Sequence, residues 1–130
     1  MTQRTKRSIE VPGVTHGSVP IPMGARVGNL IVSSGIAGKD PATDKVPEDP
    51  AAQAHFAFQN MATLVANGGG TLADVARVTV FIKDNSMREH VNKSWLELFP
   101  DPHDRPARHT QVIDLAGGML VQLEIIAVVQ

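Results

Sequence analysis

The chain has 130 residues, a formal net charge of −1, and neither cysteine nor tyrosine. This length predicts one domain, residues 1–130, with a core that needs no disulfide. The missing cysteines exclude disulfides, thiolate metal sites and a cysteine nucleophile, and the missing tyrosines exclude phenol chemistry. Because the net charge is near zero, we expect no general attraction for nucleic acid or for an anionic membrane.

The first seven residues are basic, but no apolar segment of signal-peptide length follows them. The most apolar stretch, residues 119–129, is too short to span a bilayer. We therefore expect a soluble, cytoplasmic protein with no membrane partner.

The first forty-five residues predict short strands joined by bends. Residues 8–11 predict a strand, and residues 11–22 a loop, since they hold three prolines and two glycines. Residues 25–35 predict a strand or bent hairpin, followed by a turn-rich connection over residues 39–45. The buried candidates of this region are Leu30, Ile31 and Val32.

One long helix is predicted over residues 50–66. Asp49 is typical of an N-cap and Pro50 of a first helical position. The apolar stripe at helical spacing is Ala54, Phe58, Met61 and Val65. The Asn-Gly-Gly-Gly run at residues 67–70 is more typical of a helix end than of a phosphate-binding loop.

Residues 75–83 alternate in polarity and predict a strand. One of its faces would carry Ala76, Val78, Val80 and Ile82, and the other Val75, Arg77, Thr79 and Phe81. Ser86 followed by Glu89 matches a capping box, which predicts a second helix that runs to about Phe99. The apolar side of that helix would be Met87, Val91, Trp95 and Leu98.

Two final strands are predicted over residues 106–115 and 119–129, joined as a hairpin at Gly117-Gly118. Two helices and at least four strands favour a two-layer α+β sandwich, a mixed sheet with both helices on one face. Strand parity places a mixed set on the other face: Arg77, Thr79, Phe81, Arg108, Thr110, Val112, Gln122 and Glu124. Because such a face is too apolar for water and too polar for a dry core, we expect an oligomer with polar clefts between subunits.

Arg108 is the most informative polar residue, since it falls near the start of a predicted strand. A guanidinium beside backbone N–H groups suits a carboxylate, because its charge is permanent and it binds in a bidentate way. The residues alone leave open an ordinary ion pair between subunits. The five histidines show no metal-ligand spacing, so no metal site is expected.

Several segments, over about residues 24–130, together resemble the reactive intermediate deaminase family, known as RidA or YjgF and formerly labelled endoribonuclease L-PSP. Their order and spacing, more than any single motif, make the resemblance specific. They are Val27-Gly28-Asn29-Leu30 with Ser34-Gly35, Asp40-Pro41 with Val46-Pro47, Ala52-Gln53-Ala54 with Asn60, Val80-Phe81-Ile82-Lys83-Asp84, Asn92, Pro106-Ala107-Arg108, and Val121-Gln122-Leu123-Glu124-Ile125-Ile126-Ala127.

The resemblance implies a chorismate-mutase-like fold and a homotrimer with three sites between its subunits. It implies an enzyme that hydrolyses 2-aminoacrylate-type enamines and imines to 2-oxo acids and ammonia, without metal or cofactor. Arg108 would hold the carboxylate of the small 2-imino, 2-enamino or 2-oxo acid, and Thr110 would help through its backbone N–H. Gly35 would line the same cleft, and Asn92 stands where the family has asparagine on its second helix.

Three positions depart from the family's pattern. The family's Gly-Pro-Tyr segment has no match, and Ile21 stands near the usual tyrosine, with His16 as a polar substitute. Gln122 stands where the family has a glutamate that handles the attacking water, and an amide orients water but does not accept its proton. Glu124, on the same strand face, is the candidate to compensate. Ile36 replaces a common glutamine and makes that wall more apolar.

The predicted hairpin would place Arg108 and Gln122 roughly 16 Å apart along its ladder. We therefore expect a neighbouring subunit to supply the second group of each site. In the predicted mechanism Arg108 fixes the carboxylate, and water attacks the imine carbon. That water is held by Gln122, or activated by Glu124 or by the substrate's own amine.

Three alternatives stay open. The first is a trimer that binds small carboxylates without turnover, and the second is a deaminase of a larger amino-dienoate from aromatic catabolism. The third is an RNA-cleaving protein, which the composition disfavours because the sequence shows no basic patch, no tyrosine and no paired histidines.

Overall fold

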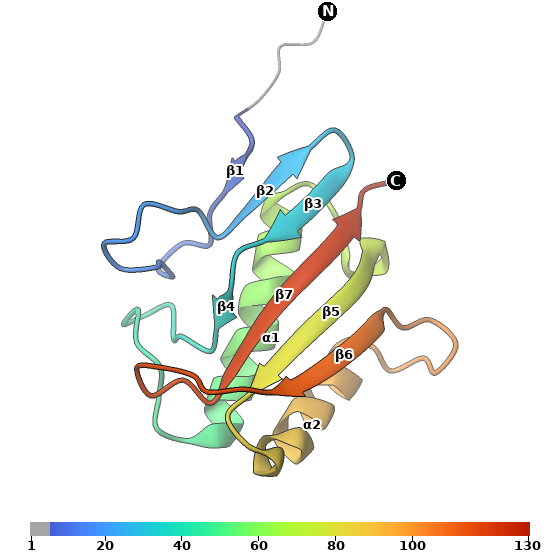
Figure 1. Cartoon of the computed structure of the whole chain (residues 1–130). Coiled ribbons are helices and arrows are strands. Elements are labelled where there is room, and N and C mark those ends of the chain that lie inside the picture. The colour runs from blue at the N-terminus through green and yellow to red at the C-terminus, as the bar shows by residue number, and fades with distance from the viewer. Residues whose placement is uncertain (1–5) are drawn as a thin grey trace, which may run out of the picture.

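The computed structural model describes residues 6–130, which form seven strands and two α-helices (Figure 1). The strands are β1 (Ser8–Ile9), β2 (Gly24–Val27), β3 (Leu30–Ser33), β4 (Ile36–Ala37), β5 (Val75–Ile82), β6 (Ala107–Val112) and β7 (Val121–Val128). The helices are α1 (Pro50–Asn67) and α2 (Arg88–Leu98), with short 3-10 turns at Leu72–Asp74 and Asn85–Met87. Most of the basic start predicted over residues 1–7 lies outside the described residues. Of the helices in the described part, none is long and apolar enough to cross a membrane.

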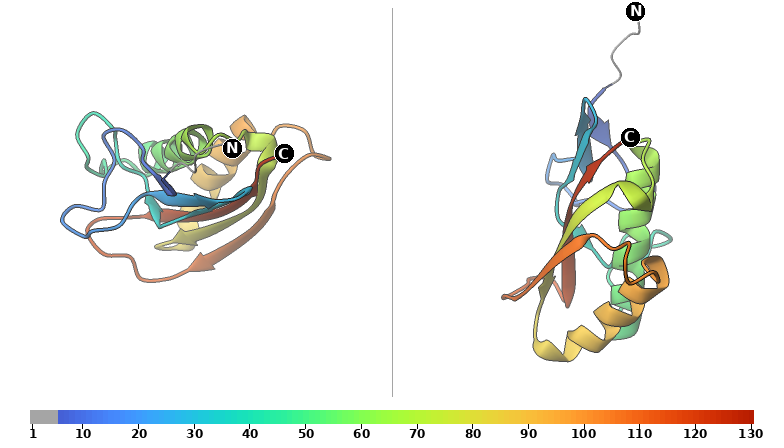
Figure 2. Two further views of the ribbon diagram at one scale, coloured as in Figure 1. Left: turned by 90° about the horizontal axis from the view of Figure 1, so that it is seen from above. Right: turned by 90° about the vertical axis from the view of Figure 1, so that its right-hand side faces the viewer.

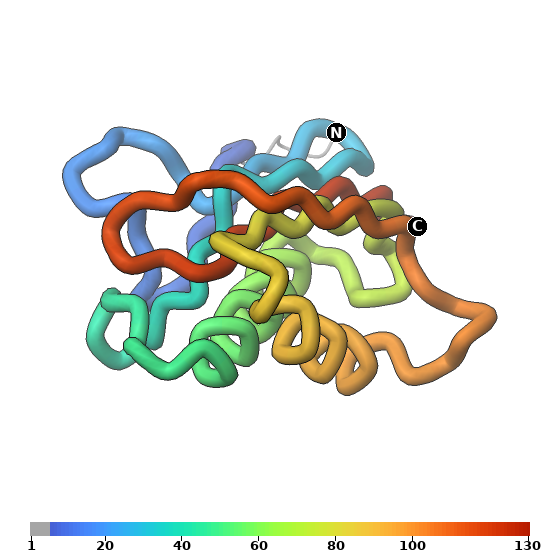
Figure 3. The backbone as a smooth tube through the Cα atoms, turned by 60° about the horizontal axis from the view of Figure 1, so that its bottom comes forward, coloured from blue at the N-terminus to red at the C-terminus, as the bar shows by residue number. Residues whose placement is uncertain are grey.

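The strands form one mixed sheet in the order β1-β2-β3-β7-β5-β6, and β4 pairs with β7 beyond the end of β3. β5 and β6 run parallel, and the other pairs are antiparallel. Both helices lie against the same face of this sheet (Figures 2 and 3). The predicted α+β arrangement of one sheet with two helices on one face is therefore confirmed.

The predicted hairpin of the last two strands is wrong, because β6 and β7 lie on opposite sides of β5. β6 follows α2, and a strand that returns after a helical crossover pairs parallel with the strand before the helix. The next residues carry the chain across the end of β5, where the Lys83 amide donates to the Leu120 carbonyl at 3.0 Å. Gly117 and Gly118 do turn the chain, with φ values of 66° and 77°, but they belong to this wide connection.

Helix α1 supplies much of the core on the helix side of the sheet, as its periodicity predicts. The Asp49 carboxylate accepts the Ala52 amide at 3.2 Å and caps the N-terminus, and Pro50 occupies the first turn. The predicted stripe is fully buried: Ala54, Phe58, Met61 and Val65. Gly69, at a φ of 88°, follows the last turn in the left-handed geometry that glycine favours.

The sheet face away from the helices, which we call the open face, is uncovered in the single chain and partly apolar. Ile31 is fully buried, but Leu30 and Val32, predicted to be buried, are 45% and 41% exposed on the open face. Ladder register places further residues here: Val27, Arg77, Thr79, Phe81, Gln122, Glu124, Ile126 and Val128. An apolar surface of this kind is typical of a contact with another chain.

Two local details differ from the sequence expectation. A β-bulge at Ala76 shifts β5 by one residue, so Val75 is buried and Ala76 is exposed, opposite to their predicted faces. The predicted capping box is also wrong, because Asp84 caps the turn before α2 by accepting the Ser86 amide at 2.9 Å. α2 itself starts at Arg88.

Two buried amides of α1 fasten the loops at one end of the sheet to the helix. Gln53, 1% exposed, donates to the carbonyls of Pro47 and Gly118 at 2.7 and 3.0 Å. It also accepts the Leu120 amide at 2.9 Å. Asn60, two turns further along α1, donates to two carbonyls of the segment around β4. The loops that follow β4 and precede β7 are therefore positioned by the helix beneath them.

We expect Gln53→Ala to lower the free energy of unfolding by about 2 kcal/mol, because it removes the three hydrogen bonds that the buried Gln53 side chain makes to partly buried backbone groups. Urea denaturation followed by circular dichroism measures this loss. Gln59→Ala, at an exposed position of the same helix, is the control and should change the free energy by less than about 0.5 kcal/mol. Equal losses for the two variants would contradict the role given to Gln53.

Candidate functional site

A pocket of about 370 Å³, which we call the β4 pocket, opens where the loop before β2, strand β4 and the start of β7 meet. Its apolar wall is formed by Val14, Ile21, Met23, Ala37 and Met119. Its polar wall is formed by Thr15, His16, Gly35, Lys39 and Gln122. Four residues predicted from the sequence therefore gather around one pocket: His16, Ile21, Gly35 and Gln122.

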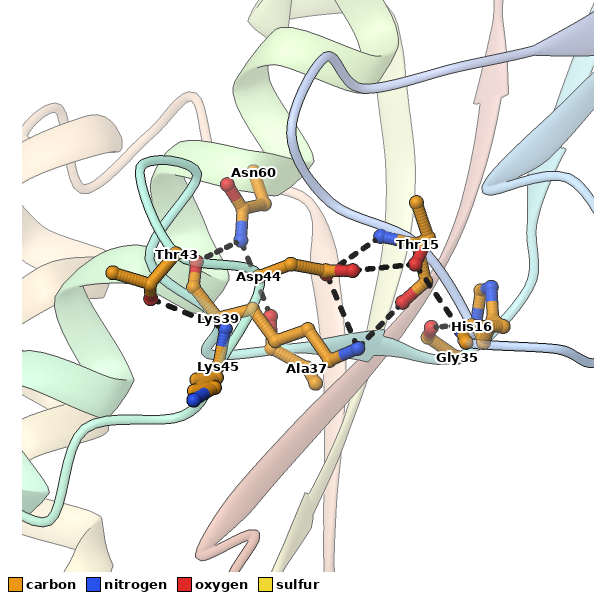
Figure 4. Close-up of polar contacts among 10 residues, drawn as sticks. Thr15, His16, Gly35, Ala37, Lys39, Thr43, Asp44, Lys45 and Asn60 are labelled. Atoms are coloured by element: carbon orange, nitrogen blue, oxygen red, sulfur yellow. Dashed lines mark hydrogen bonds and ion pairs between the residues drawn. The ribbon is translucent and has the colours of Figure 1, made fainter.

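A network around Asp44 holds the loop that carries His16 (Figure 4). The Asp44 carboxylate accepts the Thr15 amide at 2.9 Å and the Thr15 hydroxyl at 2.6 Å, and Lys39 Nζ lies 3.2 Å from it. Lys39 also donates to the Thr15 carbonyl at 2.7 Å. The hydrogen bonds from Thr15, and then the charge of Lys39, lower the pKa of Asp44 below its ordinary value. Asp44 has a φ of 58°, a left-handed geometry that aspartate and asparagine tolerate.

His16 and Gln122 both contact Gly35. His16 Nε2 lies 2.8 Å from the Gly35 carbonyl oxygen, and because a carbonyl only accepts, we assign the proton to Nε2. The other ring nitrogen, Nδ1, is buried and has no hydrogen-bond partner within residues 6–130. A Cβ added at residue 35 would overlap the Gln122 side-chain amide, so this close approach requires glycine.

Arg108 lies elsewhere, on β6 beside α2. Its guanidinium carbon is 5.2 Å from the centre of the Trp95 ring, and its Nε donates to the Thr110 hydroxyl at 3.0 Å. No carboxylate in the described part of the chain forms an ion pair with it. Burial, and then the charge of Arg88, lower the pKa of Arg108. The neighbouring Arg105, by contrast, donates to two carbonyls of the loop after α2.

The predicted sheet face of Arg108 is wrong. Ladder register places Arg108 and Thr110 beside the buried Val78 and Val80, on the helix side of the sheet, and Val112 follows the same register. Parity along one strand shows which residues share a face, but only the paired strand shows which face that is. Because β6 pairs with β5, this set lies on the side that the helices cover.

β6 is the last strand of the sheet, and its outer edge is unpaired in the single chain. The Ile113 amide donates to the Ile82 carbonyl at 3.0 Å, which points it toward β5. Successive peptide groups of a strand point to opposite sides, so the N–H groups of Arg108 and Thr110 point away from β5. A half-buried guanidinium and two unpaired backbone donors therefore lie on the same edge strand.

One chain does not bring Arg108 and Gln122 together. Arg108 is in register with Val78, which pairs with Ile125, three residues from Gln122 along β7. At about 4.8 Å per strand and 3.3 Å per residue, their Cα atoms lie roughly 14 Å apart, and their side chains belong to opposite faces. The hairpin from which this separation was predicted does not form, but Arg108 and Gln122 are nevertheless far apart within one chain.

The other two predicted site residues, Glu124 and Asn92, lie neither in the β4 pocket nor in contact with Arg108. Glu124 is exposed on the open face opposite Thr79 and lines a separate hollow of about 260 Å³ with Arg77. Asn92 is exposed on α2, one turn before Trp95.

Three residues that lie beside Arg108 or in the wall of the β4 pocket were not identified as site residues from the sequence. The sequence placed Trp95 in the apolar stripe of α2. Trp95 is buried as that stripe predicts, but the stripe does not indicate its contact with Arg108. Lys39 lies in a turn-rich connection and Met119 in a glycine-rich turn, and no local pattern marked either as part of a pocket.

Three comparisons with known proteins agree. The model of the family described as Endoribonuclease L-PSP matches residues 21–129. The chain is 33% identical over 111 residues to 2-iminobutanoate/2-iminopropanoate deaminase of Escherichia coli K12, over 84% of this chain and 87% of that protein. It is similar to the solved E. coli YjgF gene product, with a TM-score of 0.85, 29% identity and coverage of 95% and 99% of the two chains. It is also similar to E. coli TdcF with bound serine, with a TM-score of 0.86, 25% identity and coverage of 96% and 100%.

We expect the Asp44 carboxylate to stabilise the fold near neutral pH and to lose this contribution in acid. Its folded-state pKa lies below the ordinary 3.8, so the contribution is present above that value and is lost as the pH falls through the folded pKa. Asp44→Asn removes the charge but tolerates the φ of 58°. The wild type should unfold at higher urea concentration than Asp44→Asn near pH 6, with a gap that narrows below about pH 3.8.

The control for this charge change is Glu48→Gln, at an exposed position outside the Asp44 network. Its urea midpoint should stay close to that of the wild type near pH 6. If the gap for Asp44→Asn is the same at every pH, the carboxylate does not hold the loop.

Proposed function

This chain belongs to the endoribonuclease L-PSP or RidA family, and from that premise we propose that it is an enamine and imine deaminase. It would hydrolyse 2-aminoacrylate-type 2-enamino and 2-imino acids to 2-oxo acids and ammonia. The E. coli relative at 33% identity is named for this chemistry. E. coli TdcF, which shares the fold, has been solved with a small amino acid, serine, bound.

The observation that carries the proposal is the environment of Arg108. Its guanidinium is half-buried over Trp95 and is matched by no carboxylate among the residues described. Desolvating a permanent charge without a partner is unfavourable, so the position favours an anionic ligand. The Thr110 N–H on the same free edge offers the second donor that a carboxylate accepts.

We further propose that the active site forms between copies of the chain in a homotrimer. The support is that Arg108 and the β4 pocket lie on different surfaces, while the apolar open face is left uncovered. A contact that joins two different surfaces is heterologous, and three such contacts close a ring when the rotation fits. Each contact would bring the β6 edge of one copy to the β4 pocket of the next.

In this site Arg108 and the Thr110 N–H would hold the carboxylate, and the imine carbon would lie against Gln122 and His16. An enamine substrate first tautomerises to its imine. Water oriented by the Gln122 amide forms a C–O bond to the imine carbon, the C=N electron pair moves to nitrogen, and the water's proton passes to that nitrogen. In this adduct the hydroxyl proton passes to the nitrogen, the C–N bond breaks and ammonia leaves, and the C–O bond becomes the carbonyl of the 2-oxo acid. Because an amide does not accept a proton, the substrate's own nitrogen is the acceptor, and Glu124, two residues along β7, lies outside this site in the separate hollow of the open face.

Arg108→Ala should lower kcat/KM for imine hydrolysis about 10- to 150-fold, since a hydrogen bond to a charged group contributes about 1.5–3 kcal/mol. The assay is ammonia release from 2-aminoacrylate generated enzymatically, corrected for the spontaneous rate. Lys93→Ala removes an exposed positive charge from α2 and should leave kcat/KM unchanged.

A wild-type rate no faster than the spontaneous one would refute the deaminase proposal. Binding of 2-oxobutyrate in the same preparation would then identify the chain as a carboxylate-binding protein.

Mixing two impaired variants tests the shared site. Arg108→Ala lacks the carboxylate anchor and Gln122→Leu lacks the amide that orients water, so each alone should be strongly impaired. In mixed trimers from equal co-expression, about a quarter of the sites combine an intact Arg108 with an intact Gln122. We therefore expect about a quarter of the wild-type activity per site. Size-exclusion chromatography checks that both variants assemble, and activity no higher than the mean of the two variants would rule out a site between copies.

A further inference from the structure

A second arginine, Arg88, lies near Arg108. It is the first residue of α2, which runs opposite to β6 because this helix connects two parallel strands. The start of α2 therefore lies at the same end of the sheet as the end of β6 (Figure 1). Arg108 leans in this direction, since its Nε donates to the hydroxyl of Thr110, two residues further along β6. Burial, and then the charge of Arg88, lower the pKa of Arg108, so the two guanidinium groups lie close enough to repel each other.

One side of α2 connects the two arginines. Arg88, Asn92 and Trp95 are spaced four and three residues apart, which places them on the same side of the helix. The ring of Trp95 lies 5.2 Å from the guanidinium carbon of Arg108, and the Asn92 side chain, between Arg88 and Trp95, is exposed. This side of α2 and the neighbouring strand β6 therefore present two guanidinium groups with an amide between them.

The charge of Arg88 is as unmatched as that of Arg108. Neither arginine forms an ion pair within residues 6–130. The carboxylates nearest to Arg88 in the sequence have other partners, because Asp84 accepts an amide of its own turn and Glu89 lies 3.6 Å from the ring of His90. Arg88 Nε donates to the uncharged Asn85 side chain at 3.0 Å, which fixes the guanidinium without neutralising it. Two such charges favour a ligand that carries two negative charges.

We propose that Arg88 binds a second carboxylate, and that the preferred substrates are 2-imino and 2-enamino dicarboxylic acids in which a few carbons separate the two carboxylates. This inference rests on the proposed deaminase function and adds the charge of the substrate's side chain. Arg108 holds the carboxylate next to the imine carbon, and Arg88 holds the distal one. A guanidinium suits this role because it donates two parallel N–H groups to one carboxylate.

The experiment compares two imines of similar length that differ in charge. 2-Iminoglutarate is made in place from L-glutamate by L-glutamate oxidase, and the imine of L-methionine by L-amino acid oxidase, both with catalase. Enzyme-dependent loss of imine is followed as a fall in semicarbazone formation, normalised to the reaction of each imine with semicarbazide alone. At an ionic strength of about 0.02 M we expect kcat/KM for 2-iminoglutarate to be at least about fivefold higher.

Two kinds of failure can be told apart. Equal values for the two imines, a preference for the methionine-derived imine, or turnover of 2-aminoacrylate alone would overturn the second carboxylate site while the deaminase function stands. No acceleration of any of the three substrates refutes the deaminase function itself.

Removing one charge from α2 is the second arm. Arg88→Gln should lower kcat/KM for 2-iminoglutarate at least about fivefold and change that for the methionine-derived imine by less than about twofold. Lys93→Gln removes the same charge from another side of the same helix and should keep wild-type selectivity. An equal loss in the two variants would indicate a general attraction for anions and contradict the role given to Arg88, as would an equal loss for both imines in Arg88→Gln.

Binding of 2-oxo acids tests the same recognition without turnover. By titration calorimetry, 2-oxoglutarate should bind the wild type at least about fivefold more tightly than 2-oxobutyrate, and Arg88→Gln should remove most of this difference. Because Arg88 is exposed, the difference should also shrink when the ionic strength is raised to about 0.5 M. Equal affinities of the wild type for the two acids at low ionic strength would overturn the proposal.

Discussion

Strand β7 pairs along both of its edges, and the positions of Gln122 and Arg108 follow from this pairing. One edge pairs with β5, and the other pairs first with β4 and then with β3. The pairing with β4 brings Gln122 against Gly35 and so forms the floor of the β4 pocket. The pairing with β5 leaves β6 only the far edge of the sheet, which is why Arg108 faces a different surface.

The parts of this fold that depend on neighbours along the chain were predictable from sequence. The period of α1, its Asp49 cap and the glycines after its last turn are local signals, and each is confirmed. Pairing between distant strands carries no such signal. Both the hairpin of the last two strands and the face of Arg108 were therefore wrong, and the bulge at Ala76 reversed parity at the start of β5.

The same limit explains what was missed at the candidate site. His16, Gly35 and Gln122 were identified through resemblance to a family, and they do lie around one pocket. Lys39 and Met119 join them only because Asn60 and Gln53 of α1 hold their loops in place. These buried amides belong to the core and bond only to backbone groups, so the shape of the pocket wall depends on a helix that contributes no residue to the pocket lining.

The unpaired edge of β6 also bears on how the chain behaves before it meets another copy. A free strand edge is a template on which further strands add, and repeated addition leads to fibrils. β6 is only six residues long and carries the charged Arg108 between polar and small neighbours, features that interrupt such growth. The arginine proposed to anchor the substrate thus also places a charge on the strand edge where another strand would add.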